Sequence, residues 1–341
     1  MREVTIIGVD LAKRSFQLHG AAADGSVVFR KKLSRSQFLA FLTQHPTCIV
    51  AMEACATSHY WGRQIAKLGH EVKLIPPIYV KPFVKRQKND AADAEAIAEA
   101  ASRPTMRFVA VKSEIQQAQS MVFRTRDLLV RQRTQTINAL RGHLAEYGVI
   151  APQGAAYVDR LAEVIDDLNA RLPEPVRELG RMYLQQIADY EAKIEALERD
   201  IRARAKQDEE VRRLMTVPGI GPICAMAIQA FAPPIEAFKN GRDFAAWLGM
   251  VPRQNSTGGK QKLGTTSKMG QRDIRRLLII GATSAVNAAA RKGTRSIWLA
   301  RMLACKPRIL VATALANKMA RMVWALMTKK ENYRDPAEAA A

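Results

Sequence analysis

The chain has 341 residues, enough for two or three domains, and 48% of them are hydrophobic, which excludes a mainly disordered protein. Lys and Arg number 53 against 32 Asp and Glu, a formal net charge of +21. The excess is greatest over residues 251–330, where 17 basic residues accompany one acid, Asp273. Such a field suits a polyanion, so we expect nucleic acid as the partner. The plainer alternative is a soluble or ribosome-associated basic protein.

Cysteine usage and hydropathy bear on the cellular compartment. Four cysteines are scattered without CxxC spacing, which favours reduced thiols over a zinc site or a disulfide framework. The N-terminus carries two charges and too short an apolar run for a signal peptide. No apolar run reaches about 18 residues. We therefore expect no membrane span and a cytoplasmic protein.

The first region, residues 1–105, alternates strand and helix signals. Apolar runs such as "VTIIGVD" and "TCIVAME" have the composition of buried strands. Segments such as "SRSQFLAFLTQ" and "KNDAADAEAIAEAA" are typical of helices, the first with a serine cap. The order β-β-β-α-β-α-β-α predicts a mixed sheet with helices around it, within an α/β plus all-α protein.

The second region, residues 106–207, has no strand signal. Residues 115–148 can form one helix of about 30 residues that ends at Gly148. Farther on, apolar residues follow an alternating four-three spacing typical of a coiled-coil seam, at Tyr183, Ile187, Tyr190, Ile194, Leu197 and Ile201. We interpret the region as a long-helix linker that mediates dimerisation, with an antiparallel hairpin inside one chain as the alternative.

The third region, residues 208–330, opens with "VRRLMTVPGIGPICAMAIQAF", and residues 331–341 form an expected flexible tail. Helix, Pro-Gly-Ile-Gly-Pro, helix is the pattern of a helix-hairpin-helix. In that motif Gly219 and Gly221 would allow a sharp turn, and the second helix would point its free amides at a nucleic-acid phosphate. The alternative is a simple turn between two core helices. The remaining elements of this region have helical periodicity with basic faces.

Four acids have the positions that metal chemistry needs. Asp10 and Glu53 end predicted strands, and Asp90 and Asp93 lie three residues apart on one helix face. Carboxylates gathered in this way suit Mg²⁺, or Mn²⁺, which bridges phosphate oxygens during in-line attack. Each acid alone has a plainer explanation as a solvated residue at a strand end or, for Asp90, as a helix N-cap.

The segment "QNSTGGKQKLGTTSKMGQRDIRR", residues 254–276, has the composition of a phosphate-binding loop. Ser256 has no local base, because all five histidines lie before residue 144. A serine hydroxyl needs activation to act as a nucleophile. The residues that we expect to contact nucleic acid in the segment are Gly258, Gly259, Lys260, Lys262, Lys268, Arg272 and Arg275.

These motifs together carry a family resemblance. The order of elements with its acids is similar to the ribonuclease-H-like fold of RuvC. "GVDLAK", "AMEACATSHYW" and "KNDAADAEAIA" resemble the acidic blocks of DEDD transposases, an insertion-sequence family whose type member is numbered one hundred and ten. These enzymes are also called bridge-RNA-guided recombinases. The long helix, "TVPGIGPICAMAI" and residues 247–282 resemble the family's later blocks, in the family's order.

The resemblance implies a function and a site. Asp10, Glu53, Asp90 and Asp93 would be the metal-binding tetrad of a RuvC-like domain, and the C-terminal domain would supply a nucleophilic serine. That serine is assigned to Ser256, although the family often has a second serine where this chain has Thr257. Ser267 is a weaker candidate. The activity implied is DNA strand exchange through a phosphoserine–DNA intermediate.

The resemblance also implies partners: double-stranded donor and target DNA, a structured guide RNA, and a homo-oligomer, dimer or tetramer. Two other functions remain open from the residues. A RuvC-like junction endonuclease would use the four acids with water as the nucleophile. A non-enzymatic helix-hairpin-helix protein would only bind nucleic acid.

Overall fold

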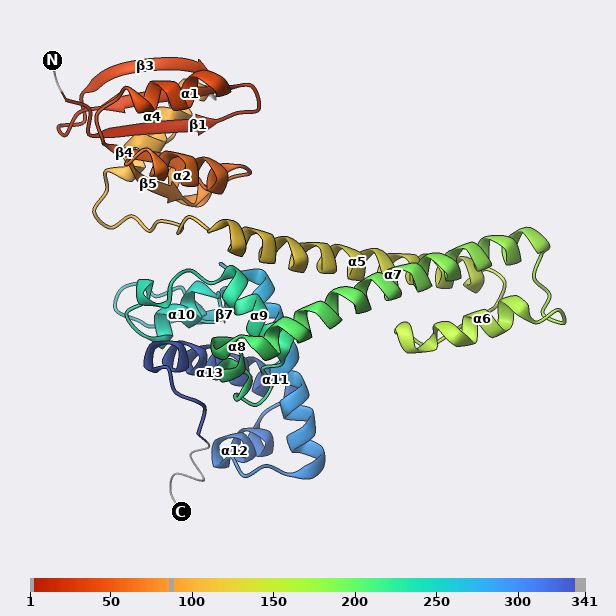
Figure 1. Cartoon of the computed structure of the whole chain (residues 1–341). Helices are drawn as coiled ribbons and strands as arrows, with labels where there is room; N and C mark the ends of the chain where they lie inside the picture. Colours follow the sequence, from red (N-terminus) through yellow and green to blue (C-terminus); the bar gives the residue numbers. More distant parts are fainter. Residues whose placement is uncertain (1–2, 86–88, 335–341) are drawn as a thin grey trace. The chain divides into compact units, whose positions relative to one another are not determined.

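The computed structural model describes residues 3–85 and 89–334, which fall into two compact units, Met1–Ile115 and Gln116–Ala341 (Figure 1). The expected boundary after residue 105 lies close to the division between the units. The regions expected at 106–207 and 208–330 both belong to the second unit, apart from residues 106–115. Of the expected tail, residues 335–341 lie outside the described residues.

The first unit contains a five-stranded sheet and its helices over the described residues. Its elements are β1 (Ile6–Leu11), β2 (Ser15–Ala21), β3 (Val27–Ser34), α1 (Arg35–Thr43), β4 (Ile49–Glu53), α2 (Ser58–Lys67), β5 (Glu71–Ile75), α3 (Pro77–Val80), the 3-10 turn η1 (Lys81–Phe83) and α4 (Asp90–Ala101). The predicted order of strands and helices is confirmed, with α3 and η1 added between β5 and α4.

The sheet order is β3-β2-β1-β4-β5. β1 pairs antiparallel with β2, and β2 with β3, whereas β4 lies parallel to both β1 and β5. This mixed sheet, antiparallel on one side and parallel on the other, is compatible with the ribonuclease-H-like expectation. It places the carboxyl ends of β1, β4 and β5 at one edge.

Side-chain alternation along the central strands buries both faces of the sheet. Val50 and Met52 pack with the α1 and α2 side chains, including Phe38 and Trp61. Ala51, one position along, belongs to the cluster formed with α4, η1 and the end of β5. Small residues on this second face allow α4 to approach the sheet closely, a property on which the site below depends.

The second unit is helical apart from a small β-ribbon. Its elements over the described residues are α5 (Glu114–Ala145), η2 (Ala155–Tyr157), α6 (Val158–Asp166), α7 (Glu174–Gln207), α8 (Glu209–Met215), α9 (Pro222–Phe231), η3 (Ile235–Ala237), α10 (Gly241–Trp247), β6 (Pro252–Gln254), β7 (Leu263–Thr266), α11 (Arg272–Lys292), α12 (Ile297–Cys305) and α13 (Arg308–Lys329). The one long helix expected after residue 115 is confirmed as α5.

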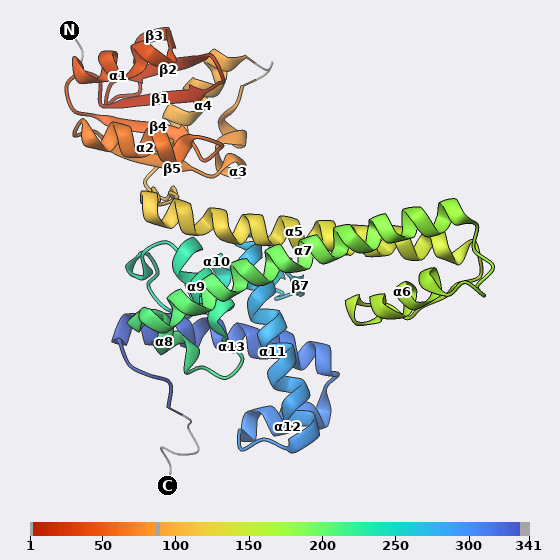
Figure 2. The ribbon, with the colours of Figure 1, turned by 45° about the vertical axis from the view of Figure 1, so that its right-hand side comes forward.

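Helices α5 and α7 lie side by side as an antiparallel hairpin (Figures 1 and 2). In the contacting pairs, the residue number rises along α5 while it falls along α7, as antiparallel helices require. The pairs are Arg126 with Glu198, Arg133 with Glu191, and His143 with Tyr183. On the predicted seam, Ile187, Ile194 and Ile201 are buried. The seam is therefore used inside the chain, which is the hairpin alternative, and these buried isoleucines are not a free dimerisation surface.

Helices α8 and α9 are joined by the expected sharp turn, with Gly219 at φ +90°. A Cβ on Gly219 would lie 2.8 Å from the Gly281 carbonyl oxygen of α11, and α9 is buried over most of its length. The glycine thus serves close packing between the turn and α11. The helix-hairpin-helix interpretation is not confirmed, and the contact of Gly219 and Gly221 with nucleic acid stays a prediction.

Over the described residues, α13 is the one helix long and apolar enough, by length and composition, to cross a membrane, a property that core helices of folded domains share. Its buried residues, among them Ala316, Met319 and Val323, belong to the same cluster as Phe244 of α10 and Leu278 of α11. Packing of this kind is what a core helix of a helical domain shows, since its apolar side is covered by its neighbours.

Candidate active site

Strand register places the first two acids next to each other. β1 and β4 are parallel, with Val9 opposite Met52, so Asp10 and Glu53 are the next residues at the carboxyl edge. Sites in open α/β sheets form where parallel strands end, because the chain leaves the sheet there. Both side chains are half-buried. The observed register thus places the two strand-end acids side by side, while their role in metal binding stays a prediction.

Helix α4 brings the other two acids to this edge. Asn89 is the N-cap, and its side chain accepts a hydrogen bond of 3.0 Å from the Ala91 amide. The capping role considered for Asp90 is therefore filled by Asn89. Asp90 and Asp93 share the first turn of the helix.

Gly8 of β1 determines how closely α4 lies on the sheet. A Cβ at residue 8 would lie 2.2 Å from the Ala94 carbonyl oxygen and 2.6 Å from the Ala98 nitrogen, closer than atoms can approach. The helix backbone thus occupies the space that a side chain would fill. This contact holds Asp93 within reach of Asp10.

We predict that Gly8→Ala lowers the stability of the protein by about 3 kcal/mol, because overpacking must displace α4. The measurement is the change in melting temperature of the full chain. Gly142→Ala is the matched control: nothing lies within 4 Å of its added Cβ, and near the C-terminal end of α5 it should stabilise by at most about 1 kcal/mol. Equal melting temperatures for the two variants would contradict the packing argument.

The carboxylates form a compact group. One oxygen each from Asp10, Asp90 and Asp93 lie within 4.8 Å of one another. Burial, and then the charges of Asp93, Asp90 and Glu53, raise the pKa of Asp10 to about 6. Burial and then Asp93 also raise the pKa of Glu53. Repulsion among oxygen donors is relieved by a hard cation, so the donor set fits Mg²⁺ or Mn²⁺.

The raised pKa gives a pH prediction. Folded Asp10 keeps its proton up to about pH 6, against 3.8 for the ordinary carboxyl group, so its contribution to stability falls as pH rises from about 4 to 6. Added Mg²⁺ should raise the melting temperature more at pH 7.5 than at pH 5, because protons compete for the carboxylate. Asp10→Asn should remove most of this difference. An equal Mg²⁺ effect at both pH values would contradict the site.

Ser256 lies at the tip of the β6–β7 hairpin, in the second unit. Asn255 and Lys262 pair through the Asn255 amide and the Lys262 carbonyl at 2.8 Å. Gly258 and Gly259 have φ of +55° and +76°, which a two-residue turn with left-handed central residues requires. The Ser256 hydroxyl is exposed and accepts a hydrogen bond of 3.1 Å from the Lys262 amide. It is accessible to a ligand.

The base of the hairpin is fixed to α10 and α11. A Cβ on Gly270 would lie 1.9 Å from the Trp247 carbonyl oxygen, and one on Gly249 would lie 2.0 Å from that of Met269. Arg275 donates to the Leu248 carbonyl at 2.8 Å, and burial lowers its pKa. Arg275 thus has a structural role, whatever it contributes to nucleic-acid binding.

The other predicted phosphate contacts lie on the surface around this hairpin. Lys260, Lys262, Lys268 and Arg272 are exposed, and Arg272 begins α11, whose N-terminus favours anions. Lys268 has φ +54°, a conformation that turns the chain from β7 toward α11. The structure thus gathers these residues near one hairpin, while their role on nucleic acid stays a prediction.

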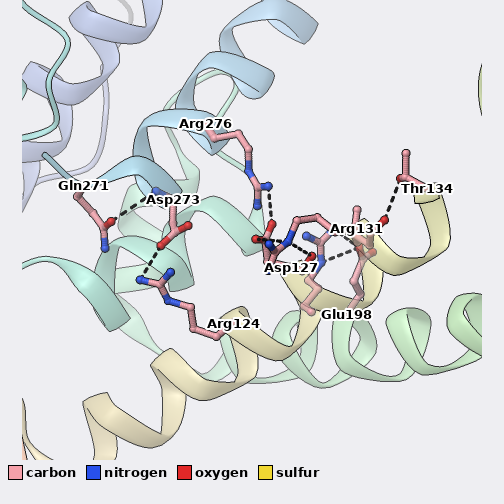
Figure 3. A network of polar contacts seen from close by, with 10 residues as sticks. Arg124, Asp127, Arg131, Thr134, Glu198, Gln271, Asp273 and Arg276 are labelled. Carbon is pink, nitrogen blue, oxygen red and sulfur yellow. Dashed lines mark hydrogen bonds and ion pairs between the residues drawn. The ribbon is translucent and has the colours of Figure 1, made fainter. Parts of the chain in front are cut away.

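A network of ion pairs joins α5 to the start of α11 (Figure 3). Arg124 pairs with Asp273 at 3.2 Å, and Arg276 pairs with Asp127. Sequence reasoning missed this link. Its one available signal was Asp273, the only acid in residues 251–330. The network thus links α11, which follows the β6–β7 hairpin, to the α5–α7 hairpin.

Comparison with known proteins gives the family. Residues 7–149 match a DEDD transposase family of IS110, and residues 211–296 match the family described as Transposase IS116/IS110/IS902. A relative named "Probable family 20 transposase", from Pseudomonas aeruginosa, is 50% identical over 96% of this chain and 98% of its own length.

Two further relatives are transposases of insertion sequences. That of IS1328 from Yersinia enterocolitica is 43% identical over 96% of this chain and 98% of the relative. That of IS1111A from Coxiella burnetii is 37% identical over 98% of this chain and 92% of the relative. With identity at this level over nearly its whole length, the chain belongs to the IS110/IS116 family of transposases.

Proposed function

We propose that this chain is a DNA transposase that cleaves and rejoins strands with Mg²⁺ and through a covalent bond to Ser256. The observation that carries the proposal is the group of carboxylates from Asp10, Asp90 and Asp93 within 4.8 Å, beside Glu53. Family membership supports DNA as the substrate and a divalent metal as the cofactor. The serine mechanism and the guide are proposals beyond the family assignment.

The reaction is a pair of transesterifications. The Ser256 oxygen attacks a DNA phosphorus, loses its proton to solvent or a carboxylate, and forms a phosphoserine ester. The bond from phosphorus to one deoxyribose oxygen breaks, and that oxygen leaves protonated. The hydroxyl of another strand then attacks the ester and restores the Ser256 hydroxyl. Because one phosphoester replaces another, the exchange needs no energy-rich co-substrate.

Residues of both units have roles in this scheme. Asp10, Glu53, Asp90 and Asp93 would hold Mg²⁺, or Mn²⁺, which polarises the phosphate and stabilises the leaving oxygen when it is bound. Lys260, Lys262, Lys268 and Arg272 would neutralise charge on the phosphate. Gly258 and Gly259 keep the hairpin tip free of side chains, so a DNA backbone can approach Ser256.

Two partners complete the proposal. The large positive charge suits a structured guide RNA as well as duplex DNA, and a guide would leave the protein to read shape and backbone. Recombination joins donor and target duplexes, so at least a dimer is required, and a tetramer supplies one site for each strand. The rival function is a junction endonuclease in which water, rather than Ser256, attacks the phosphate.

One experiment separates these functions. The starting material is a plasmid that carries the gene with its flanking DNA, which would encode any guide. Labelled fragments of the plasmid serve as the DNA substrate, and RNA transcribed from it supplies the guide. Full-length protein should then form a protein–DNA adduct that survives denaturation, only when Mg²⁺ is present. Cleavage without an adduct would favour the endonuclease, and neither product would favour a protein that only binds.

A further inference from the structure

The first unit contains a cavity of ≈ 550 Å³ in the part of the chain that the structure describes, away from the carboxylates. It lies between α3–η1 and the turn that follows α4; α3 and α4 are labelled in Figure 2. Two aromatic rings, Tyr79 and Phe83, and two arginines, Arg103 and Arg107, are among its lining residues. We call it the arginine–aromatic pocket.

Backbone hydrogen bonds hold both walls of this pocket. On one wall the Tyr79 amide donates to the Pro76 carbonyl at 2.9 Å. On the other, the Met106 amide donates to Arg103 at 3.1 Å, and the Val109 amide donates to Leu74 of β5 at 2.7 Å. Phe83 and Met106 also pack on the buried cluster beneath α4. The pocket is therefore formed before any ligand binds, which lowers the entropic cost of binding.

The lining combines ring faces with positive charge. Tyr79 is 42% exposed, so its ring is available to a ligand. The Arg103 guanidinium lies 5.7 Å from the centre of the Phe83 ring and pairs with Glu99, which fixes its plane. Arg107 is exposed, and no acid lines the pocket. An anionic ligand with a flat ring is complementary to such a surface.

We propose that the arginine–aromatic pocket binds an unpaired nucleotide of a single-stranded nucleic acid. The base stacks on Tyr79, and Arg107 contacts a neighbouring phosphate. Stacking on an aromatic ring is sequence-tolerant and needs a base that is free of its duplex partner. The cavity volume lies in the range of small-ligand sites. A base inside a regular duplex cannot insert, so the pocket distinguishes unpaired from paired strands.

The pocket is a second site and not part of the metal centre. Asp90 and Asp93 begin α4, whereas Arg103 follows its C-terminal end, and 12 residues of helix span about 18 Å. Binding there is therefore independent of the cleavage chemistry, and it can be tested with strands that the enzyme does not cut. The strand is DNA opened during exchange or an unpaired segment of RNA, and both share this chemistry.

The test is the affinity of the full chain for a labelled oligonucleotide of about 12 nucleotides, as DNA and as RNA. Tyr79→Ala should weaken single-strand binding about tenfold and leave duplex affinity unchanged. Tyr60→Ala is the matched control, since Tyr60 is exposed to a similar degree, 48%, and does not line the pocket. An oligonucleotide whose central nucleotide is 2-aminopurine should lose fluorescence on binding to the wild type and less so with Tyr79→Ala.

A second comparison separates stacking from charge. Arg107→Ala should weaken binding and reduce its salt dependence. With an oligonucleotide in which every base is replaced by an abasic sugar, Tyr79→Ala should no longer weaken binding, whereas Arg107→Ala still should. Lys32→Ala, a surface residue elsewhere on this unit, should have a smaller effect. The RNA and DNA arms identify which strand binds more tightly.

Three outcomes would overturn the proposal. Tyr79→Ala and Tyr60→Ala could weaken single-strand binding equally, or Tyr79→Ala could weaken duplex binding as much. Alternatively, Tyr79→Ala could change the mass of the oligomer in sedimentation and leave nucleotide affinity intact, which would make the pocket a protein contact. Because this affinity is measured with a strand that is not cut, failure of the cleavage mechanism and failure of this site are distinguishable.

Discussion

Ser256→Ala is expected to abolish the denaturation-resistant protein–DNA adduct and to reduce strand exchange at least about 10³-fold, since no other group takes the place of a covalent nucleophile. The Ser256 hydroxyl is exposed at the hairpin tip, and it already accepts a hydrogen bond from the Lys262 amide. Folding should change little, because the contact that Ser256→Ala removes is this one exposed hydrogen bond. The measurement is adduct on a denaturing gel with labelled DNA and Mg²⁺.

Thr257→Ala is the matched control, because Thr257 is the neighbouring hydroxyl and begins the Gly258–Gly259 turn. Its backbone carbonyl accepts from the Lys260 amide at 3.0 Å, a bond that the substitution leaves in place. The Thr257→Ala variant should therefore keep the adduct. If Thr257→Ala removed the adduct and Ser256→Ala did not, the nucleophile would be the threonine. If both variants kept it, the serine mechanism would be wrong.

The proposed serine mechanism requires a group that activates the Ser256 hydroxyl. Over the described residues of the second unit, the one histidine is His143, which contacts Tyr183 on the α5–α7 hairpin. Between Pro252 and Lys268 the hairpin has no carboxylate and no imidazole side chain. In the proposed mechanism Asp10, Glu53, Asp90 and Asp93 would hold a metal ion, which would supply the activation that the hairpin itself lacks.

The sequence predicted the elements with strong local signals. Asp10 and Glu53 follow apolar strand runs, and parallel pairing of β1 with β4 puts consecutive register positions at one edge. The position of α4 depends instead on Gly8, whose role is a close contact with Ala94 far along the chain. A glycine inside a strand indicates that another backbone approaches closely, but the sequence does not show which segment it is. The periodicity of the strands and helices therefore predicts where each acid lies on its element, but not the distance between the acids.

Features that depend on tertiary contacts were beyond the sequence. The Ile187–Ile194–Ile201 spacing fits a dimer seam and an intrachain hairpin equally, and only the pairing of Arg126 with Glu198 and of Arg133 with Glu191 distinguishes them. The Gly219 turn resembles a phosphate-binding motif, while its backbone packs against Gly281. The arginine–aromatic pocket combines two separate segments, which no local pattern in the sequence brings together.

Asp93→Asn is expected to remove Mg²⁺-dependent cleavage and adduct formation together, by at least about 10²–10³-fold, because Asp93 faces both Asp10 and Glu53 across the group. Loss of its charge also removes a cause of the raised pKa of Asp10, so that pKa should fall toward its ordinary value. The apo protein should therefore become more stable at neutral pH even as activity is lost. The measurements are cleavage with increasing Mg²⁺ and melting temperature without it.

Glu99→Gln is the control on the same helix, since Glu99 pairs with Arg103 near the far end of α4. It carries the same change of charge and should leave both cleavage and its Mg²⁺ dependence near wild-type values. A gain in stability without loss of activity in Asp93→Asn would mean that the carboxylates repel one another but hold no catalytic metal. Loss of activity with loss of stability would mean that Asp93 mainly supports the fold. Loss of activity with a gain in stability is the result that assigns both charge repulsion and metal binding to the carboxylates. Like charges held close together destabilise the protein without metal, and a cation-binding site gives a reason to keep them.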